Sequence, residues 1–414
     1  MKRLILILQL TGFFSLQAQV TVDEFLNSAF HTPGLKSLTW QDNYLNERPY
    51  RLAPIQKLEF RTESNQLDPE RQDYALRINP ANPWEVKRNT QYFKTYQEVV
   101  QLDYDRTLKA ALKSRYEAII EWQFLTKERQ LKEDEKRSAE KMISIVEGQR
   151  HSALFDANDY VKLKLDQVET VIELEEALFK IDTHHSKIVS LLETARFKKI
   201  EWSYDQIISL DQLQVVVDSI AAQGVARGEV AYREKQITLA THEWELEKAN
   251  INMGFLQAQY QPFRTEQGRT PWNLSLGVTI PVFNPNKGDM TKRKLEILEA
   301  QGDRDEAQQE SLSGIESMKD KIKSLINRHH EVGTLITNQQ TNSLSSTLQQ
   351  LNDPAAVVRL QRNLTKLKSI TIRLEKEILI SYIEFLSYAE ALQQRPLVNF
   401  LSPTLSKVVI GNEN

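Results

Sequence analysis

The chain has 414 residues, of which 40% are hydrophobic and 26% are charged, a balance that excludes a wholly disordered polymer. Its mean hydropathy of −0.48, with no internal apolar run of about 20 residues, excludes a transporter whose helices cross the bilayer repeatedly. The absence of cysteine excludes disulfides, thiol catalysis and cysteine-ligated metal centres. The net charge of −3 does not favour nucleic acid as the principal partner.

Residues 1–18 have the pattern of a secretory signal peptide. Lys2 and Arg3 precede an apolar stretch that runs to about Leu16, and the small residue Ala18 marks the expected cleavage site. Because Leu16 stands where a small residue is usual, the cut could shift slightly. The alternative, a retained anchor helix, is weaker because the stretch is short and passes directly into polar sequence. With no cysteine near the cut, no lipoprotein anchor is expected.

Long stretches without proline mark the expected helices, because proline breaks the hydrogen bonding of a helix interior. No proline occurs between Pro83 and Pro262, and Pro354 interrupts the stretch that follows Pro285. Apolar residues in these stretches recur at intervals of three and four, as in coiled-coil seams. They are Leu108, Leu112, Tyr116 and Ile119; Val161, Leu165, Val168 and Ile172; Ile315, Met318, Ile322 and Leu325; and Val357, Leu360, Leu364 and Leu367.

Each half of the chain is therefore expected to contain one antiparallel helical hairpin, over residues 83–198 and 285–394. A helix from Pro83 to Gly148 would be about 100 Å long, which no compact globule holds. Turn-like sequence at residues 148–156 and a break at residues 352–354 let the chain reverse.

Two proline-rich segments, with strands over residues 57–79 and 255–281, precede the hairpins. In residues 272–280 (WNLSLGVTI) an apolar residue alternates strictly with a small or polar one, and residues 264–270 supply a turn before them. The first segment alternates more weakly, and its strand pair is expected to be short and charged. Such alternation fits a membrane barrel with a wet interior, and equally a soluble sheet with one buried face.

The two halves repeat the same order of helix, strand hairpin, Asn-Pro and long helical hairpin. Asn82-Pro83 and Asn284-Pro285 are 202 residues apart, which indicates a tandem duplication. We expect a first repeat over residues 19–205, a second over residues 206–396 and a C-terminal tail over residues 397–414. Four strands cannot close a barrel alone, because an open edge in lipid leaves backbone groups unsatisfied, so the subunit is expected to oligomerise.

The sequence resembles the TolC family of outer-membrane efflux proteins over residues 21–392. The most specific part is residues 272–284 (WNLSLGVTIPVFN) with the following Lys292-Arg293-Lys294, which looks like that family's second-half strand leading through a Pro-aliphatic-Phe turn into a periplasmic helix. The resemblance implies a mainly α protein with a small β part. Long antiparallel helical hairpins would form a periplasmic α-barrel, and four strands per subunit would contribute to a twelve-stranded outer-membrane β-barrel in a homotrimer.

The function implied by the resemblance is a passive exit duct in the outer membrane of a Gram-negative bacterium, serving a tripartite efflux or type I-like export system. Its partners would be a periplasmic adaptor (membrane fusion) protein and an inner-membrane pump. The principal alternative is a periplasmic coiled-coil adaptor or scaffold without its own pore. An adaptor would show one dominant hairpin flanked by glycine-rich β domains, whereas this chain has two comparable hairpins and few glycines.

On this resemblance, the alternating strands supply two sets of residues. Those expected to line the water-filled interior are Glu59, Arg61, Glu63, Asp73, Arg77, Gln257, Gln259 and Gln261, and an ordinary exposed sheet edge is the alternative for the charged ones. Those expected to face outer-membrane lipid are Leu256, Tyr260, Trp272, Leu274, Leu276, Val278 and Ile280.

Adaptor contact and gating are expected at the two hairpin tips. The first tip comprises His151, Leu154, Phe155 and Asp156, and the second comprises Asn352, Asp353 and Pro354. In the family, acidic side chains near the second tip narrow the entrance, which makes Asp353 a candidate. An Asn-Asp-Pro turn also occurs for backbone reasons alone.

Catalytic and metal-binding motifs are incomplete. His242-Glu243 and His330-Glu331 begin like a zinc-protease helix, but no second histidine follows at the required spacing. The pairs His184-His185 and His329-His330 diverge by about 100° on a helix, so solvent-facing side chains are the better interpretation. Residues 126–141, rich in charges of both signs, are interpreted as a solvated helix face. We expect no enzyme activity, no cofactor and no metal.

Overall fold

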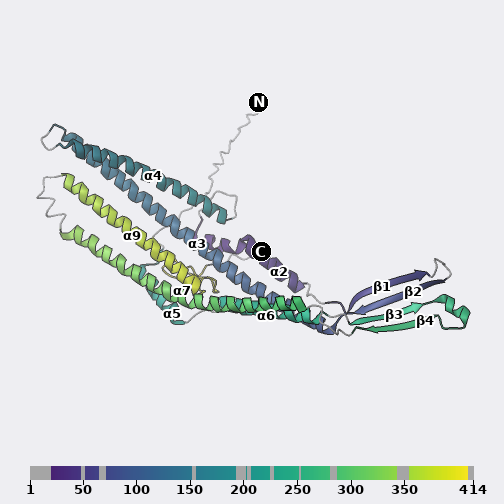
Figure 1. Cartoon of the computed structure of the whole chain (residues 1–414). Coiled ribbons are helices and arrows are strands. Elements are labelled where there is room, and N and C mark those ends of the chain that lie inside the picture. Colours follow the sequence, from purple (N-terminus) through teal and green to yellow (C-terminus); the bar gives the residue numbers. More distant parts are fainter. Residues whose placement is uncertain are drawn as a thin grey trace, which may run out of the picture.

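The computed structural model describes residues 20–47, 52–64, 71–151, 155–192, 202, 207–223, 228–250, 253–279, 287–342 and 354–408. The protein is elongated, with a small sheet at one end and long helices running away from it to two hairpin tips at the other (Figure 1). The predicted fold class, mainly α with a small β part, is confirmed. The expected signal peptide, residues 1–18, lies outside the described residues.

The first helical hairpin begins with α3 (Pro83–Gly148), whose 66 residues make it about 100 Å long at 1.5 Å per residue. Its start is set locally, because Pro83 needs no donor in the first turn and Asn82 Oδ1 accepts a hydrogen bond from the Trp84 amide at 3.0 Å. The return helix, α4 (Ala157–Leu191), begins similarly, since the Asp156 carboxylate accepts a hydrogen bond from the Asn158 amide at 2.8 Å.

The second hairpin consists of α7 (Lys287–Asn342) and α9 (Pro354–Tyr388). It ends earlier than expected, because Glu390 adopts a φ of 53° and turns the chain into a C-terminal segment over residues 389–408. Shorter helices occupy the rest of the chain. They are α1 (Val22–Asn27), η1 (Ser28–His31), α2 (Pro33–Glu47), α5 (Leu210–Gln223) and α6 (Gly228–Ala249).

The sheet contains β1 (Ile55–Ser64), β2 (Gln72–Pro80), β3 (Gly254–Tyr260) and β4 (Trp272–Val278), all antiparallel in the order β1-β2-β3-β4. A short helix, η5 (Pro262–Gln267), joins β3 to β4. The expectation that the first strand pair is short is wrong: β1 and β2 have 10 and 9 residues, against 7 in each strand of the second pair. Charged residues alternate with apolar ones in β1, and its ladder with β2 is regular from Lys57 to Ser64.

The helices continue the order of the strands. Next to the sheet, α2 precedes β1 and α6 precedes β3 along the chain, whereas α3 follows β2 and α7 follows β4. These four helices pack in the order α2, α3, α6, α7. Farther from the sheet the packing order is α4, α3, α9, α7. Among the described residues, the molecule is therefore a slab four elements wide. We call the side formed by β1, α2 and α4 the first edge, and the side formed by β4 and α7 the second edge.

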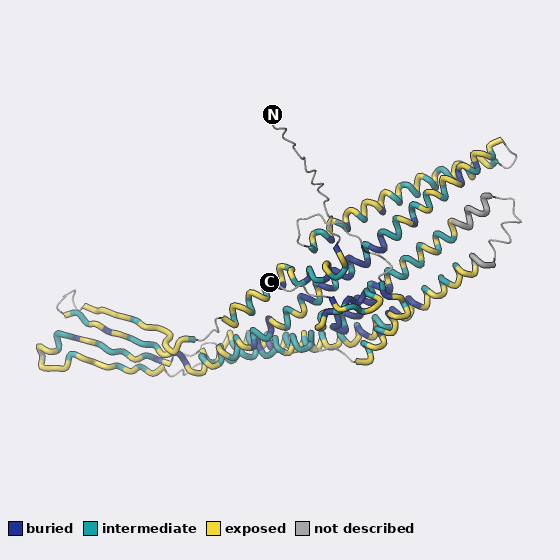
Figure 2. The backbone as a smooth tube through the Cα atoms, turned by 180° about the vertical axis from the view of Figure 1, so that it is seen from behind, coloured by how far each residue is buried: buried dark blue, intermediate teal, exposed yellow. Residues whose placement is uncertain are grey.

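The hydrophobic core lies in the middle of the slab, where the two terminal segments pack on α3 and α9; Figure 2 shows buried residues gathered there. Leu108, Leu112 and Tyr116 of α3 are at most 1% exposed. The Arg115 guanidinium is buried among them and donates to the Ser28 and Leu191 carbonyl oxygens, both at 2.9 Å. Arg115 thus ties α1–η1 and the end of α4 to α3.

One predicted seam is wrong. Val161, Leu165, Val168 and Ile172 of α4 are 54–66% exposed and do not form the contact with α3. The buried residues of α4 are Ala177, His184 and Ile188, so another face of the helix packs on α3. Helical spacing identified an apolar stripe correctly but could not say which neighbour covers it.

Candidate functional site

One face of the four-stranded sheet is apolar and exposed. The strand register places Leu58, Ile78, Leu256 and Leu276 in one row across the sheet, and Phe60, Leu76, Ala258 and Leu274 in the next. Leu274 and Leu276 are 71% and 74% exposed, and Leu58 and Phe60 are nearly as open. A contiguous apolar face of this kind marks an interaction surface with protein or lipid.

Aromatic residues end this face at the side of the sheet away from the helices. Tyr74, Tyr260 and Trp272 share a row with Thr62, and the rings of Tyr260 and Trp272 lie 4.8 Å apart between centroids. All three aromatic side chains are exposed. An apolar band ending in amphipathic aromatic residues is typical of strands that reach a membrane–water interface.

The opposite face of the sheet is polar. Its rows contain Glu59, Arg77, Gln257 and Ser275, then Arg61, Ala75, Gln259 and Asn273. The side chains are linked: Arg77 Nε donates to Gln257 Oε1 at 2.9 Å, and Glu59 pairs with both Lys57 and Arg61. Asp73 Oδ2 accepts from Gln259 and Gln261 Nε2 at 3.0 and 2.6 Å. The charged side chains of this face are therefore largely paired or hydrogen-bonded with neighbouring side chains of the same sheet.

An aromatic side chain on the polar face was missed by the sequence analysis. The Arg77 guanidinium lies 4.1 Å from the centre of the Phe255 ring, an attractive cation–π distance. Phe255 fills the space beside Gly277, where an added Cβ would stand 2.4 Å from the ring. Gly277 is one of the small residues in the strict alternation of β4, but nothing local indicates that Phe255 of the paired strand needs its space.

The predicted strand residues separate as their alternation required. Glu59, Arg61, Glu63, Asp73, Arg77, Gln257 and Gln259 share the polar face, and Gln261 joins them just beyond β3 through its bond to Asp73. The described residues of the other set, Leu256, Tyr260, Trp272, Leu274, Leu276 and Val278, are all exposed on the apolar side. Ile280 lies outside the described residues.

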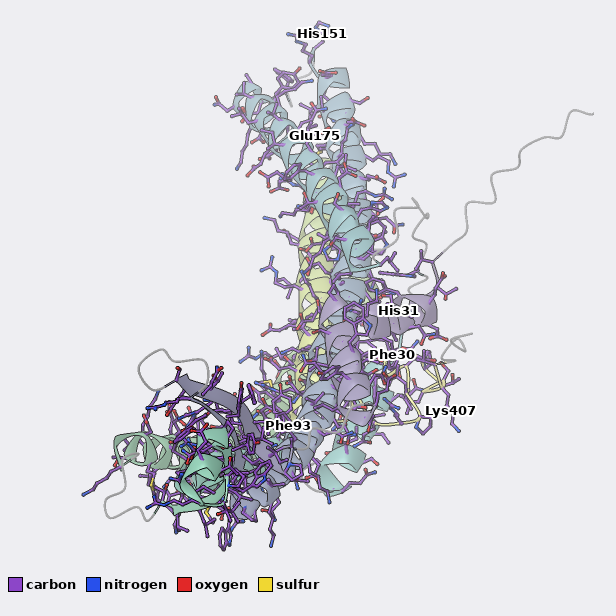
Figure 3. All side chains as sticks on the ribbon, turned by 90° about the vertical axis from the view of Figure 1, so that its right-hand side faces the viewer. Phe30, His31, Phe93, His151, Glu175 and Lys407 are labelled. Carbon is purple, nitrogen blue, oxygen red and sulfur yellow. The ribbon has the colours of Figure 1, made fainter. Side chains whose placement is uncertain are left out.

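The hairpin tips lie far from the sheet; Figure 3 labels His151 at the far end of the helices and Phe93 near the sheet. His151 is exposed just after α3, and the Phe155 and Tyr160 rings lie 6.0 Å apart across the start of α4. Asp156 is occupied as the cap of α4. Of the other tip residues, Leu154, Asn352 and Asp353 lie outside the described residues, and Pro354 is the first residue of α9.

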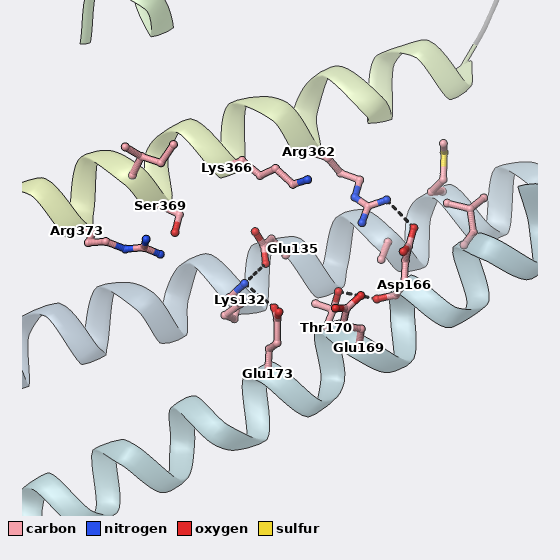
Figure 4. Close-up of a pocket in the computed structure, with 14 residues that line it drawn as sticks. Lys132, Glu135, Asp166, Glu169, Thr170, Glu173, Arg362, Lys366, Ser369 and Arg373 are labelled. Atoms are coloured by element: carbon pink, nitrogen blue, oxygen red, sulfur yellow. Dashed lines mark hydrogen bonds and ion pairs between the residues drawn. The ribbon is translucent and has the colours of Figure 1, made fainter. Parts of the chain in front are cut away.

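A polar groove of about 430 Å³ lies between α3, α4 and α9 on the way to the tips (Figure 4). Lys132 bridges Glu135 and Glu173 at 2.7 and 2.6 Å, and Arg362 of α9 pairs with Asp166 of α4 at 2.7 Å. The interpretation of residues 126–141 as a solvated helix face is thus only partly right. Leu131 is buried and Lys132 joins α3 to α4, because this stretch faces its own hairpin partner.

The histidine pairs do not gather into a metal site, and within the described ranges no cluster of three or more His, Asp or Glu side chains is positioned to hold a metal ion. The solvent-facing interpretation is wrong for His184, which is 8% exposed and whose Nε2 donates to the Ala118 carbonyl at 2.8 Å. Burial lowers its pKa. Among the helices of the described residues, none is both long enough and apolar enough to span a bilayer.

Comparison with known proteins assigns the fold. Neither a family model nor a curated protein matches this sequence. Solved structures do match: the outer membrane protein VceC from Vibrio cholerae has a TM-score of 0.65 at 10% identity, over 89% of this chain and 96% of its own. The outer-membrane channel OprN has a TM-score of 0.65 at 8% identity over 89% of each chain. The Campylobacter jejuni CmeC outer membrane channel has a TM-score of 0.61 at 9% identity over 92% of this chain and 86% of its own.

The chain therefore has the fold of outer-membrane channel proteins. The resemblance to the TolC family, predicted from residues 272–284 and the duplicated plan, is confirmed at the level of the fold.

Proposed function

We propose that this chain is one subunit of a passive exit duct in the outer membrane of a Gram-negative bacterium. The observation that carries the proposal is the two-faced sheet, which is apolar and exposed on one side and polar on the other. Lipid would contact the face bearing Leu274 and Leu276, and water would fill the side bearing Glu59, Arg77 and Gln257. The channel fold of VceC, OprN and CmeC supports the same assignment.

A ring of three subunits fits such a duct best. The sheet leaves the outer sides of β1 and β4 without a described strand partner, and an open edge is not tolerated in lipid. Two copies would give about eight strands, an interior that side chains fill, whereas three copies give twelve and leave a water-filled lumen. The homotrimer with a twelve-stranded barrel is therefore part of the proposal.

The partners we propose are a periplasmic adaptor protein and an inner-membrane pump of a tripartite efflux or type I-like export system. The helices would extend through the periplasm as an α-barrel, and the tips around His151, Phe155 and Asp156 would meet these partners. Asp353 stays our candidate for narrowing the entrance. A periplasmic adaptor or scaffold without a pore is less favoured, because it would leave the apolar face of the sheet in water.

Fractionation and electrical recording test the proposal together. After separation of bacterial membranes, the protein should co-sediment with outer-membrane markers. The detergent-purified protein should produce stable ohmic steps in a planar lipid bilayer, because an aqueous lumen conducts ions without an energy source. Recovery of a soluble monomer that neither binds bilayers nor conducts would exclude the duct.

A further inference from the structure

The outermost row on the polar face of the sheet, at the end away from the helices, contains two carboxylates and an amide (Figure 1). Glu63 of β1 is the cross-strand partner of Asp73 of β2. Gln261, just beyond β3, lies beside Asp73 because Tyr260 and Tyr74 are paired one residue nearer the helices. Three side chains that can supply oxygen ligands therefore come together from the ends of three neighbouring strands.

Two oxygen atoms of this row are buried and have no hydrogen-bond partner among the described residues: Asp73 Oδ1 and Gln261 Oε1. The other carboxylate oxygen, Asp73 Oδ2, accepts from Gln259 Nε2 at 3.0 Å and from Gln261 Nε2 at 2.6 Å. The Gln261 side chain is thus held against Asp73, and the residue is only 8% exposed. Buried acceptors that receive no hydrogen bond cost free energy, so these two oxygens require a donor or a cation.

The negative charge of this row is not balanced by a basic side chain. Within the described ranges, no ion pair joins Glu63 or Asp73 to a lysine or arginine, and both nearby bases of β1, Lys57 and Arg61, pair with Glu59. Like charges directly opposite each other destabilise an antiparallel strand pair. A bound cation would compensate both carboxylates and also satisfy the two buried oxygens, whereas a water molecule would do only the second.

The main chain around Gln261 holds its side chain in place. The Gln261 amide donates to the Pro271 carbonyl at 2.8 Å, and the Gln261 carbonyl accepts from the Arg264 amide of η5 at 3.2 Å. Residues 65–70, which connect β1 to β2 along the chain, contain no lysine or arginine. The amide oxygen is therefore positioned before any ligand binds, which lowers the cost of binding one.

We propose that Glu63, Asp73 and Gln261 form a calcium site on the polar face of each subunit. The ligands are the Glu63 carboxylate, Asp73 Oδ1 and Gln261 Oε1, and water completes the roughly six to eight oxygens that Ca²⁺ takes. Carboxylate and amide oxygens select a hard cation, and this irregular set suits Ca²⁺ better than Mg²⁺, which demands near-ideal octahedral geometry. With two carboxylates and several waters, the dissociation constant should be about 10⁻⁴–10⁻³ M.

The calcium site goes beyond the proposed function, because all three ligands come from one subunit and none depends on a pore. Asp73 and Gln261 are 188 residues apart, in different halves of the chain, so the cation joins the two halves at the end of their common sheet. The sequence analysis expected no metal because it tested histidine spacings, whereas these ligands meet only through strand pairing. In the proposed duct, each subunit would hold one cation at the outer mouth of the lumen.

Terbium luminescence tests the site, because Tb³⁺ is a hard cation close to Ca²⁺ in size and is excited by energy transfer from a neighbouring indole ring. Trp272 directly follows Pro271, the residue that Gln261 contacts across the strands. Detergent-purified protein that has been freed of metal with EGTA should therefore give saturable sensitised emission. Added Ca²⁺ should displace Tb³⁺ about tenfold more effectively than Mg²⁺ does.

Variants separate ligation from general acidity. Glu63→Gln and Asp73→Asn should each weaken Tb³⁺ binding by about tenfold or more. Glu63 makes no hydrogen bond or ion pair with the described residues, so Glu63→Gln keeps the test decisive if Asp73→Asn disturbs the sheet. The matched control is Glu266→Gln in η5, which removes an exposed carboxylate near the row and should bind as the wild type does.

The calcium site would be overturned by wild-type protein without saturable emission, by equal affinity in Glu63→Gln and the wild type, or by an equal loss in Glu266→Gln. Displacement by Mg²⁺ as effective as that by Ca²⁺ would also overturn it. Conductance is a separate readout. Protein that binds calcium without conducting keeps the site and excludes the duct, and conducting protein that does not bind calcium does the reverse.

Discussion

Two buried tyrosines in the central core differ in the hydrogen bonding of their hydroxyl groups. Tyr116 OH donates to the Val398 carbonyl at 2.9 Å and accepts from the Phe400 amide at 3.2 Å, which fastens the C-terminal segment to α3. Tyr382 OH is equally buried and has no partner among the described residues. Burial raises the pKa of both phenols, so both stay neutral at physiological pH.

Tyr116→Phe should therefore destabilise the protein by about 1–3 kcal/mol, because it leaves a partly buried carbonyl and a buried amide without partners. Tyr382→Phe is the matched control and should change stability by less than about 1 kcal/mol. The hydroxyl group that it removes is buried without a hydrogen-bond partner among the described residues, so no hydrogen bond is lost. Thermal unfolding of the detergent-purified variants, followed by circular dichroism, measures both. Equal losses in the two variants would contradict the assigned hydrogen bonds.

His184 gives the core a pH dependence. Burial lowers its pKa, so below about pH 6.5 the unfolded chain binds a proton that the folded chain does not. Stability contributed by neutral His184 is therefore complete above the unfolded pKa and is lost as pH falls below it. We expect the unfolding midpoint to fall between pH 7.5 and pH 5 more in the wild type than in His184→Gln, with the exposed His151→Gln as control. An unchanged pH dependence in His184→Gln would refute this contribution.

At the scale of elements, alternation in the strands was sufficient to divide the side chains between two faces. The division holds in all four strands because successive side chains of a strand point to opposite sides. What the pattern left open was the pairing of β2 with β3, whose partners Arg77 and Gln257 are 180 residues apart. That pairing merges the strand hairpins of the two halves into one sheet and makes the apolar face continuous.

Leu276→Arg tests the lipid-facing assignment of that face. An arginine at this position should cost about 2–4 kcal/mol if it lies near the middle of the bilayer, and the yield of assembled protein in the outer membrane should fall accordingly. Ser275→Arg, one residue away on the polar face, should assemble normally because its charge would enter water. Comparable yields of assembled protein for the two variants, whether both normal or both reduced, would argue against the assignment.

At the scale of the whole molecule, the two halves of the chain contribute corresponding elements to one architecture. The spacing of 202 residues between the Asn-Pro pairs recurs as the offset between α3 and α7 at equal heights, so each half contributes one long helix to a common slab. The first half adds α2 and α4 along one edge, and the second half adds α6 and α9 inside. Among the described residues, elements of the first half therefore form one edge of the slab and elements of the second half form the other.

The shape can be measured independently of function. Small-angle neutron scattering, with the detergent matched out, should give a maximum dimension above about 100 Å, because α3 alone spans that length. A compact globule of this chain length would instead have a radius of gyration near 22 Å, which corresponds to a diameter of about 57 Å for a uniform sphere. A maximum dimension well below about 100 Å would contradict the long helices.

The sequence by itself determined the features that depend on neighbours along the chain. Proline positions and capping residues set the start of α3 at Pro83, and alternation set the two faces of β4, because both effects act over a few residues. Only the tertiary structure decided which surfaces meet: that β2 pairs with β3, that Gln261 reaches Asp73, and that the apolar stripe of α4 faces away from α3. The physical reason is that a periodic pattern states which side of an element is apolar, whereas the choice of neighbour depends on packing between segments far apart in the chain.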